Sequence, residues 1–382
     1  LFQIIIITRL SDGIETILRE NQCGFRKNRS CTDQLFSLRV IMERALEYNL
    51  PLCINFIDFK AAFDSVNRDY IWSALEHYGL PEKYINIFKA FYSNTESAVR
   101  VDDDLTDWFK VESGTGQGDI QAPSIFNIVL NWVMEQAISE KSLSEGFLLE
   151  RRRSSRYPAV FITDLDYADD IAVLDCSAAG LQETTSNIAN AGKAAGLRIG
   201  VNKTKTMLVG KFHSQRPYHL SETLDIEIDG QLLEQVNHFR YLGSTISSDG
   251  SIDKEINVRI GVASNAFNAL NNVWRNRGIC LPTKIKIYEC GVITPLLYGC
   301  ATWALKQRQL QRLDGFHHNC LRRILKVRYF DHVSNVEIRR RTGCCSLGIT
   351  IRYARLLYFG HVARMPNERF PKYLLDWTPT HG

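Results

Sequence analysis

Two adjacent carboxylates, Asp169 and Asp170, lie in a short polar stretch between apolar segments. The flanking runs, residues 160–162 and 171–174, are rich in β-branched and aromatic residues, which predicts two strands joined by a tight turn. Two like charges side by side repel each other and resist burial unless a cation lies over them. Mg²⁺ suits such a site because it usually takes one or two carboxylates together with substrate phosphates. Taken alone, the pair also fits a solvated turn.

A third carboxylate, Asp58, ends a second apolar run over residues 53–59. Alternation along this strand places Ile54, Phe56 and Asp58 on one face, so that Asp58 emerges where the run ends. If the two elements pair in one sheet, Asp58 and Asp169 can converge on two metal ions. Ions roughly 3.5–4 Å apart would clamp the attacking and leaving oxygens of an in-line phosphoryl displacement. That reaction asks a protein mainly for positioning and charge neutralisation.

These carboxylates belong to a series of six short blocks. The blocks are residues 21–30, 56–64, 116–127, 167–170, 196–204 and 239–243. In this order they resemble the N-terminal block and the polymerase motifs A to E of reverse transcriptases from non-LTR (LINE-type) retrotransposons. The stretch around residues 356–362 resembles the region that follows the thumb in those proteins. The resemblance implies an α+β right-hand polymerase with an antiparallel palm sheet, partial helical fingers and a helical thumb.

The resemblance also implies an activity. It is RNA-directed DNA synthesis, in which deoxynucleoside triphosphates are added to a primer 3′-hydroxyl by a two-metal mechanism. The partners would be an RNA template, a DNA primer and deoxynucleotides, with two Mg²⁺ ions, or Mn²⁺, as cofactors. The residues alone allow either nucleic acid as template. The resemblance places the protein in the nucleus.

The resemblance further implies roles for single residues. Metal ligands would be Asp58, Asp169 and Asp170, with Lys203 as an acid near the leaving pyrophosphate. Phe63 would lie beneath the incoming sugar and exclude a 2′-hydroxyl, and Phe59, Gln117 and Gly118 would contact nucleotide or template. Primer and template would be held by Arg26, by Tyr241, Leu242 and Gly243, and by Arg322 and Arg323. The last two also follow from the residues, because they lie opposite the apolar stripe of a predicted helix, and a basic helix face suits a phosphate backbone.

Helix and strand patterns give a division of the chain. We expect partial fingers over residues 1–50, a palm with finger insertions over 51–246, a helical thumb over 247–330 and a C-terminal extension over 331–382. Helices are predicted near residues 32–46, 70–78, 123–136 and 181–195. In a helix after Pro81, residues 84, 87, 88 and 91 should form the apolar stripe, and residues 97–114 should form an antiparallel pair. His317 and His318 are expected at a wet edge of the thumb.

Composition narrows the class of protein. The chain has 382 residues, 45% of them hydrophobic, which is typical of a globular protein with more than one small core. A net charge of +4 means that nucleic-acid binding would depend on local basic patches. Ten cysteines without a secretory signal predict reduced intracellular thiols, and no transmembrane segment or membrane partner is predicted.

Departures from the family pattern leave alternatives open. Gly116 stands where a basic residue is common, and residues 120–122 replace the usual Pro/Leu-Ser run. The chain starts without Met and lacks the upstream endonuclease domain of full-length elements, which predicts a fragment. The alternatives are a related polymerase or maturase with the same palm, and a catalytically silent, transposon-derived nucleic-acid-binding fragment.

Overall fold

The computed structural model describes residues 2–116, 118–138, 146–152, 154, 156, 159–210 and 223–379. The chain forms two compact units. The first comprises Leu1–Gln34, Val40–Asn237 and Asp376–Gly382, and the second comprises Leu35–Arg39 and His238–Leu375. The chain mixes helices and strands, as expected for an α+β protein. In the part of the chain that the structure describes, no helix is both long and apolar enough to cross a bilayer.

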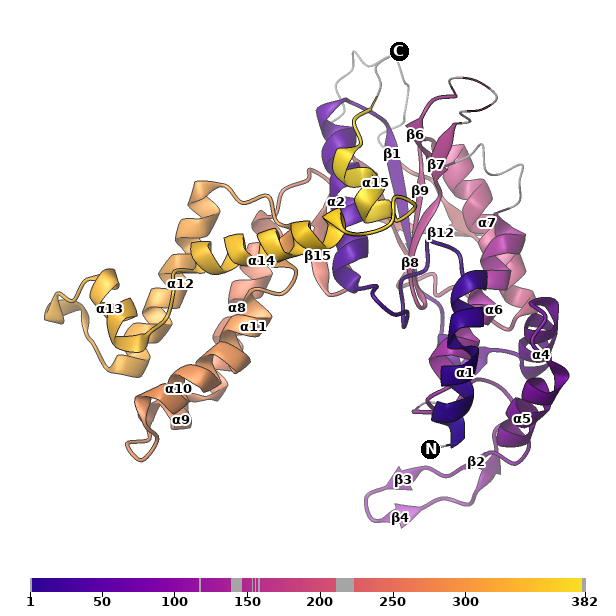
Figure 1. Cartoon of the computed structure of the whole chain (residues 1–382), viewed down its shortest axis with the longest axis horizontal. Helices are drawn as coiled ribbons and strands as arrows, with labels where there is room; N and C mark the ends of the chain where they lie inside the picture. The colour runs from indigo at the N-terminus through magenta and orange to yellow at the C-terminus, as the bar shows by residue number, and fades with distance from the viewer. Residues whose placement is uncertain are drawn as a thin grey trace. The chain divides into compact units, whose positions relative to one another are not determined.

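A five-stranded sheet forms the centre of the first unit (Figure 1). Its order is β13 (Glu234–Gln235), β10 (Lys205–Val209), β1 (Leu52–Ile57), β9 (Asp170–Asp175) and β8 (Asp164–Tyr167). Neighbouring strands are antiparallel, except for the parallel pair β10 and β13. All six residues of β1 are buried, in keeping with its central place. The helix α7 (Ala178–Ala194) packs on β1 and β9, and α6 (Ala122–Ala137) packs on α7.

The hairpin that carries the paired carboxylates differs from the predicted one. Residues 160–162 form β7 (Val160–Ile162), which pairs with β6 (Phe147–Glu150) and not with residues 171–174. The strand that pairs with β9 is β8, which begins after Thr163. The Thr163 carbonyl accepts a hydrogen bond from the Leu174 amide at 2.8 Å. The extended stretch of residues 160–167 is therefore divided at Thr163, with β7 pairing with β6 and β8 pairing with β9. The composition of this stretch could not indicate the division.

More helices lie wholly or mostly in the first unit. They are α1 (Phe2–Ile17), α2 (Cys31–Glu47), α3 (Ala62–Ser65), α4 (Arg68–His77) and α5 (Glu82–Tyr92). Of these, α4 packs on α5 and, through α6, on the layer of α6 and α7 that covers the sheet. A capping box fixes the start of α2, because the side chains and backbones of Ser30 and Asp33 bond reciprocally. In α5 the buried side chains are Ile85, Phe88 and Tyr92. The stripe predicted for this helix is confirmed, because Phe88 is in the core and Tyr84, Ile87 and Phe91 are half-buried and pack against it.

Short strands complete the first unit. The expected pair over residues 97–114 is confirmed: β2 (Glu96–Ser97) pairs with β5 (Phe109–Lys110), and β3 (Arg100–Val101) pairs with β4 (Asp104–Leu105). A second hairpin joins β11 (Glu227–Ile228) and β12 (Gln231–Leu232).

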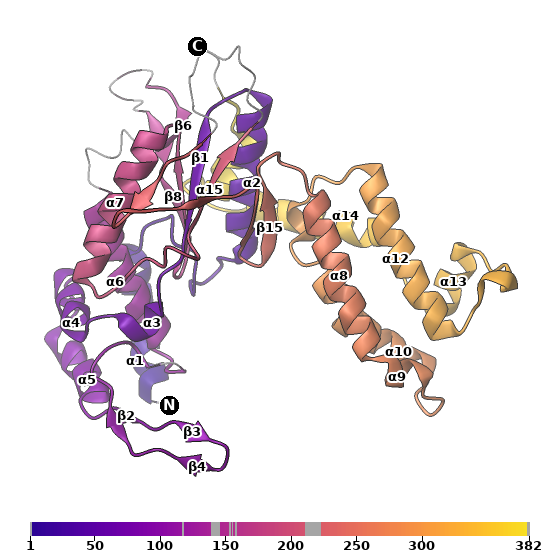
Figure 2. The same cartoon turned by 180° about the vertical axis from the view of Figure 1, so that it is seen from behind.

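The second unit consists of one hairpin and a set of helices (Figure 2). The hairpin is β14 (His238–Tyr241) with β15 (Ser244–Ser247). The main helices are α8 (Asp253–Ala269), α9 (Asn271–Arg275), α10 (Leu281–Tyr288), α11 (Thr294–Leu296), α12 (Gln307–Leu325), α13 (Asn335–Thr342), α14 (Leu347–Ala363) and α15 (Phe370–Asp376). Their core includes the buried rings of Phe267, Tyr288 and Trp303.

His317 lies inside this core, so its predicted place at a wet edge was wrong. It is 2% exposed, and its Nδ1 lies 2.9 Å from the Tyr288 hydroxyl oxygen. His318 is also buried, with Nδ1 2.7 Å from the Asp314 carbonyl oxygen. Burial, with a contribution from the His318 charge, lowers the pKa of His317 to about 4. The helix turns both rings inward because each finds a polar partner there.

The buried imidazole gives a pH prediction. An unfolded histidine has a pKa of about 6.5 and takes up a proton before the folded one does. We therefore expect the free energy of unfolding to fall as the pH drops from about 6.5 to 4.5, with His317 responsible for about 2–3 kcal/mol of the loss. Urea unfolding at several pH values checks this. In His317→Gln the acid loss should shrink by that amount, whereas His361→Gln, at a half-buried site, should keep the slope of the parent.

Candidate active site

The three predicted carboxylates lie at one end of the central sheet. Asp58 directly follows β1, Asp169 is in the turn between β8 and β9, and Asp170 begins β9. β1 and β9 are neighbouring strands, and Ile57 lies opposite Ile171. The segments that carry the carboxylates therefore meet at the same end of these two strands. The two elements do pair in one sheet, which is the condition set above for Asp58 and Asp169 to converge.

Burial and the charges of neighbouring carboxylates raise the pKa of two of these groups. Burial, and then the charge of Asp58, raise the pKa of Asp169, although Lys203 opposes the shift. Partial loss of water contact, with the charges of Asp169 and Asp58, raises the pKa of Asp170 to about 6, even though the residue as a whole is exposed. A cation placed among the three groups would reverse these shifts.

The chemistry of Asp58 fits a divalent ion. Its Oδ2 is buried and has no hydrogen-bond partner among the described residues, and the Lys203 amine lies 3.6 Å from it. A buried anionic oxygen without a donor is unusual and is satisfied by a bound cation. No group of three or more acidic, His or Cys side chains among the described residues could hold an ion by itself. Mg²⁺ is commonly held by one or two carboxylates and completed by phosphate and water oxygens, and Asp58 and Asp169 offer such carboxylates.

The segment of residues 196–204 is fastened alongside Asp58. The Gly200 amide donates to the Asp58 carbonyl at 2.7 Å, and the Asp58 amide donates to Thr204 Oγ1 at 3.2 Å. A pocket of about 200 Å³ opens here, lined in part by Asp58, Gly200 and Lys203. The Lys203 side chain is 75% exposed, so its amine is free to follow a ligand in that pocket.

Residues 21–24 clamp the acidic turn from the other side, and sequence reasoning missed this role. Gln22 Oε1 accepts hydrogen bonds from the amides of Gly24 and Ala168, both at 2.7 Å. A Cβ on Gly24 would come within 2.2 Å of the Ala168 nitrogen, so glycine is required at this position. The turn needs such support because Ala168 has φ +54°, which is costly for a residue with a Cβ. The only signal in the sequence was the position of Gln22 within the N-terminal block.

Phe63 is held by two other aromatic rings. It stacks on Phe126 with ring centroids 4.2 Å apart, and Phe25 meets it edge-on at 6.3 Å. Its side chain is half-buried, so one edge stays accessible. Phe59, by contrast, is 4% exposed and packs in the hydrophobic core, which leaves only its backbone for contact with a nucleotide.

The loop before α6 is held against the segment that carries Phe63. The Gly114 amide donates to the Val66 carbonyl, and the Thr115 amide donates to the Phe63 carbonyl, both at 2.7 Å. Gly118 is exposed and has φ +91°, a conformation that favours glycine. Gln117, predicted to contact nucleotide or template, lies outside the described residues.

Arg26 is engaged within the protein. Its side chain is 3% exposed and pairs with Glu15 at 2.6 Å. It also donates to the carbonyls of Arg19 and Gln22, at 2.6 and 2.9 Å. These bonds favour a structural role in holding the clamp over direct contact with nucleic acid.

The other predicted nucleic-acid contacts lie in the second unit. Tyr241 and Leu242 are buried at the turn between β14 and β15, where Leu242 and Gly243 have φ +46° and +74°. Their carbonyls are occupied: Leu242 accepts from the Tyr298 hydroxyl at 2.9 Å, and Gly243 accepts from Arg259.

Arg322 and Arg323 border a pocket of about 680 Å³ in that unit. Arg322 donates to the Val333 carbonyl at 2.7 Å, and Arg323 lies over the Phe267 ring at 4.7 Å. Tyr329 lines the same pocket and is 94% exposed, and Phe330 beside it is 64% exposed. Arginines beside exposed aromatic rings are typical of surfaces that bind single-stranded nucleic acid.

The pKa of Asp170 gives a second pH prediction. Between about pH 4 and 6 the folded chain keeps a proton that the unfolded chain has lost, so stability without metal falls as the pH rises through this window. We expect Asp170→Asn to raise the melting temperature in EDTA by roughly 2 °C at pH 7 and by less at pH 4. Mg²⁺ should raise the melting temperature of the parent more than that of the variant. Equal responses of both proteins to pH and Mg²⁺ would contradict the assignment.

The chain is similar in sequence to known proteins. The family model described as "Reverse transcriptase (RNA-dependent DNA polymerase)" matches residues 1–246. The chain is 28% identical over 210 residues to a Pol polyprotein from the type-1 retrotransposable element R2 of Nasonia vitripennis, covering 54% of this chain and 19% of that protein. It is 24% identical over 347 residues to the probable RNA-directed DNA polymerase from transposon BS of Drosophila melanogaster, covering 86% and 35%.

A third relative extends over nearly the whole chain. The RNA-directed DNA polymerase from mobile element jockey of Drosophila funebris is 22% identical over 373 residues, which is 95% of this chain and 38% of the relative. The chain thus spans between a fifth and two fifths of these relatives. Telomerase from Candida tropicalis, in complex with a fragment of telomeric RNA, matches with a TM-score of 0.44 and 11% identity, covering 98% of this chain and 56% of that one. The sequence matches confirm the resemblance to non-LTR retrotransposon polymerases.

Proposed function

This chain belongs to the reverse transcriptase (RNA-dependent DNA polymerase) family, and from that membership we propose that it copies RNA into DNA. The reaction is attack of a primer 3′-hydroxyl on the α-phosphorus of a deoxynucleoside triphosphate, with release of pyrophosphate. The observation that carries the proposal is the position of Asp58 and Asp169 at the same end of neighbouring strands, with a buried oxygen of Asp58 lacking a donor.

Each part of the site has a proposed task. Asp58 and Asp169 would hold Mg²⁺, or Mn²⁺, with Asp170 as the third carboxylate. When bound, the metal lowers the pKa of the primer hydroxyl and neutralises the triphosphate. Lys203, with its amine 3.6 Å from Asp58 Oδ2, would give a proton to the leaving pyrophosphate. The accessible edge of Phe63 would meet the 2′ position of the incoming sugar.

The right-hand division is part of this proposal. Residues 1–50 would be partial fingers, 51–246 the palm, 247–330 the thumb and 331–382 an extension. Support comes from the sheet of the first unit and the helices of the second. The hairpin of β14 and β15 groups with the helical unit rather than with the sheet. Nuclear localisation, an RNA template and a DNA primer belong to the same proposal.

Primer extension tests the function directly. The full chain is incubated with poly(rA)/oligo(dT), dTTP and Mg²⁺, and product length is read on a gel. We expect extension that EDTA abolishes and that excess Mg²⁺ restores. Tight binding of primer–template without any extension would overturn the polymerase and favour a silent nucleic-acid-binding protein.

That second function has an observation of its own in its favour. The pocket at Arg322 and Arg323, with the exposed ring of Tyr329, can bind nucleic acid without any chemistry at the carboxylates. We expect Tyr329→Ala to weaken binding of single-stranded oligo(rA) about tenfold, because base stacking on an aromatic ring contributes about 1–3 kcal/mol. Fluorescence anisotropy in the absence of Mg²⁺ measures this. Tyr353→Ala, at a ring 63% exposed in the same unit, serves as the control and should bind like the parent. Equal affinities for all three proteins would remove the pocket from consideration.

A further inference from the structure

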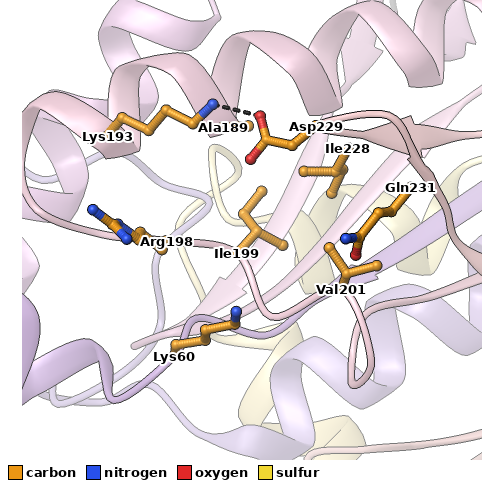
Figure 3. A pocket seen from close by; sticks show the side chains of 9 residues that line it. All are labelled: Lys60, Ala189, Lys193, Arg198, Ile199, Val201, Ile228, Asp229 and Gln231. Carbon is orange, nitrogen blue, oxygen red and sulfur yellow. Dashed lines mark hydrogen bonds and ion pairs between the residues drawn. The ribbon is translucent and has the colours of Figure 1, made fainter.

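A second pocket lies beside the carboxylates, between α7, the hairpin of β11 and β12, and the segment of residues 198–201 (Figure 3). Its volume is about 200 Å³. Apolar side chains, among them Ile199 and Ile228, form part of its wall. Lys60, Lys193 and Arg198 add three cations, against the single carboxylate of Asp229. None of these side chains has a role in the reaction proposed above.

The charges in this pocket are only partly compensated. Lys193 Nζ lies 2.5 Å from Asp229 Oδ1, and both side chains are about half exposed or more. Among the described residues, the side chains of Lys60 and Arg198 make no ion pair. The pocket therefore has a positive electrostatic potential, because, of the three cations described in it, only Lys193 is paired with a carboxylate. The apolar wall has a low dielectric constant, which strengthens this potential.

The pocket is continuous with the candidate active site. Lys60, Val201 and Gln231 line it and also line the pocket that contains Asp58 and Lys203. The two walls are joined by a hydrogen bond from the Lys60 amide to the Arg198 carbonyl, at 2.8 Å. An anion that moves away from Asp58 on this side therefore meets Lys60 and then the remaining cations.

We propose that this pocket binds a polyphosphate group, either the pyrophosphate released by the reaction or the triphosphate of a nucleotide on its way to Asp58. The inference rests on the proposed polymerase function. Two features select this ligand class. Several cations within one small space match a compact ligand with several negative charges. The volume is below the roughly 300–1,000 Å³ of pockets that enclose drug-sized molecules, so it suits a phosphate chain rather than a whole nucleotide.

Asp229 provides a gain-of-binding test. Replacing it with Asn frees Lys193 from its ion pair, and Asn tolerates the positive φ of +50° at this position. Isothermal titration of the full chain with sodium pyrophosphate in EDTA should then show about fivefold tighter binding, whereas Lys193→Gln and Arg198→Gln should each bind about fivefold more weakly. Glu234→Gln is the matched control: Glu234 is 67% exposed and pairs with Lys205 at 2.7 Å, but neither residue lines the pocket.

The comparison of variants and ligands decides the outcome. If Asp229→Asn and Glu234→Gln change the affinity equally, general charge explains the binding and the proposal fails. It also fails if orthophosphate binds as tightly as pyrophosphate. Competition by dTTP would identify the triphosphate of a nucleotide as a ligand, and its failure to compete would identify pyrophosphate as the specific ligand.

Failure of the pocket and failure of the polymerase can be told apart. Binding in EDTA does not require catalysis, so it is measurable even if the chain extends no primer. Asp169→Asn should lose extension yet keep its affinity for pyrophosphate in EDTA. A clear gain of affinity in that variant, from the loss of a repelling charge, would place the anion at the carboxylates and overturn the separate pocket.

Discussion

Asp169→Asn should abolish primer extension, by at least about a thousandfold, while the affinity for primer–template changes less than about threefold. The amide keeps the size of the side chain but loses the charge that a divalent ion requires, and catalysis of phosphoryl transfer depends on that ion. The same substitution removes the charge whose burial, and then whose repulsion by Asp58, raise the pKa of Asp169, so the metal-free variant should melt no lower than the parent. Rates of extension, anisotropy with a labelled primer–template and melting curves are needed together.

Asp103→Asn is the matched control for this variant. It removes one carboxylate from the same unit, at the fully exposed tip of the hairpin of β3 and β4, and should extend primers like the parent. If Asp169→Asn also loses primer–template binding and melts early, the aspartate has a structural role in the turn. If it retains extension, the metal site has been assigned to the wrong residue.

The second large effect is expected on sugar selection. Phe63→Val should raise the relative use of ribonucleotides about a hundredfold, because a smaller side chain no longer collides with a 2′-hydroxyl. The stacked Phe126 and the edge of Phe25 hold the Phe63 ring in place, so the collision is with a fixed group. The measurement is the ratio of kcat/KM for dTTP to that for UTP on the same template.

Phe63→Tyr separates exclusion from simple loss of packing. Tyrosine keeps the ring, and the selectivity ratio should stay within about threefold of the parent value. The ratio is informative even if Phe63→Val loses stability, since both substrates are tested on the same folded fraction. An unchanged ratio in Phe63→Val would mean that the ring does not meet the sugar.

Local patterns in the sequence were sufficient for much of the first unit. Alternating apolar residues identified β1, and the residue types around the carboxylates identified a hairpin, because both signals depend on near neighbours. Which strands pair with one another was harder to predict from the sequence. The division at Thr163 depends on pairing with β6, and no property of residues 160–167 distinguishes that partner.

The candidate site was predictable only in part, for a similar reason. Three carboxylates and a lysine could be named because acidic residues at strand ends are unusual and carry chemistry. The clamp formed by Gln22 and Gly24 could not, because its bonds reach residues 146 positions away. His317 was misplaced because two adjacent polar residues suggested a solvated face, although buried hydrogen-bond partners from other elements satisfy them.

The clamp has a consequence for the order of assembly. Its two halves, around Gln22 and Ala168, are separated by 146 residues, so closing this contact encloses a very long loop of chain. Such non-local contacts form slowly because the entropy of loop closure must be overcome first. On a ribosome adding roughly 5–20 residues per second, residues 21–24 leave the tunnel about 7–30 seconds before the acidic turn follows them. During that interval Gln22 lacks its partner Ala168, so the acidic turn is expected to be among the last parts of the first unit to become native.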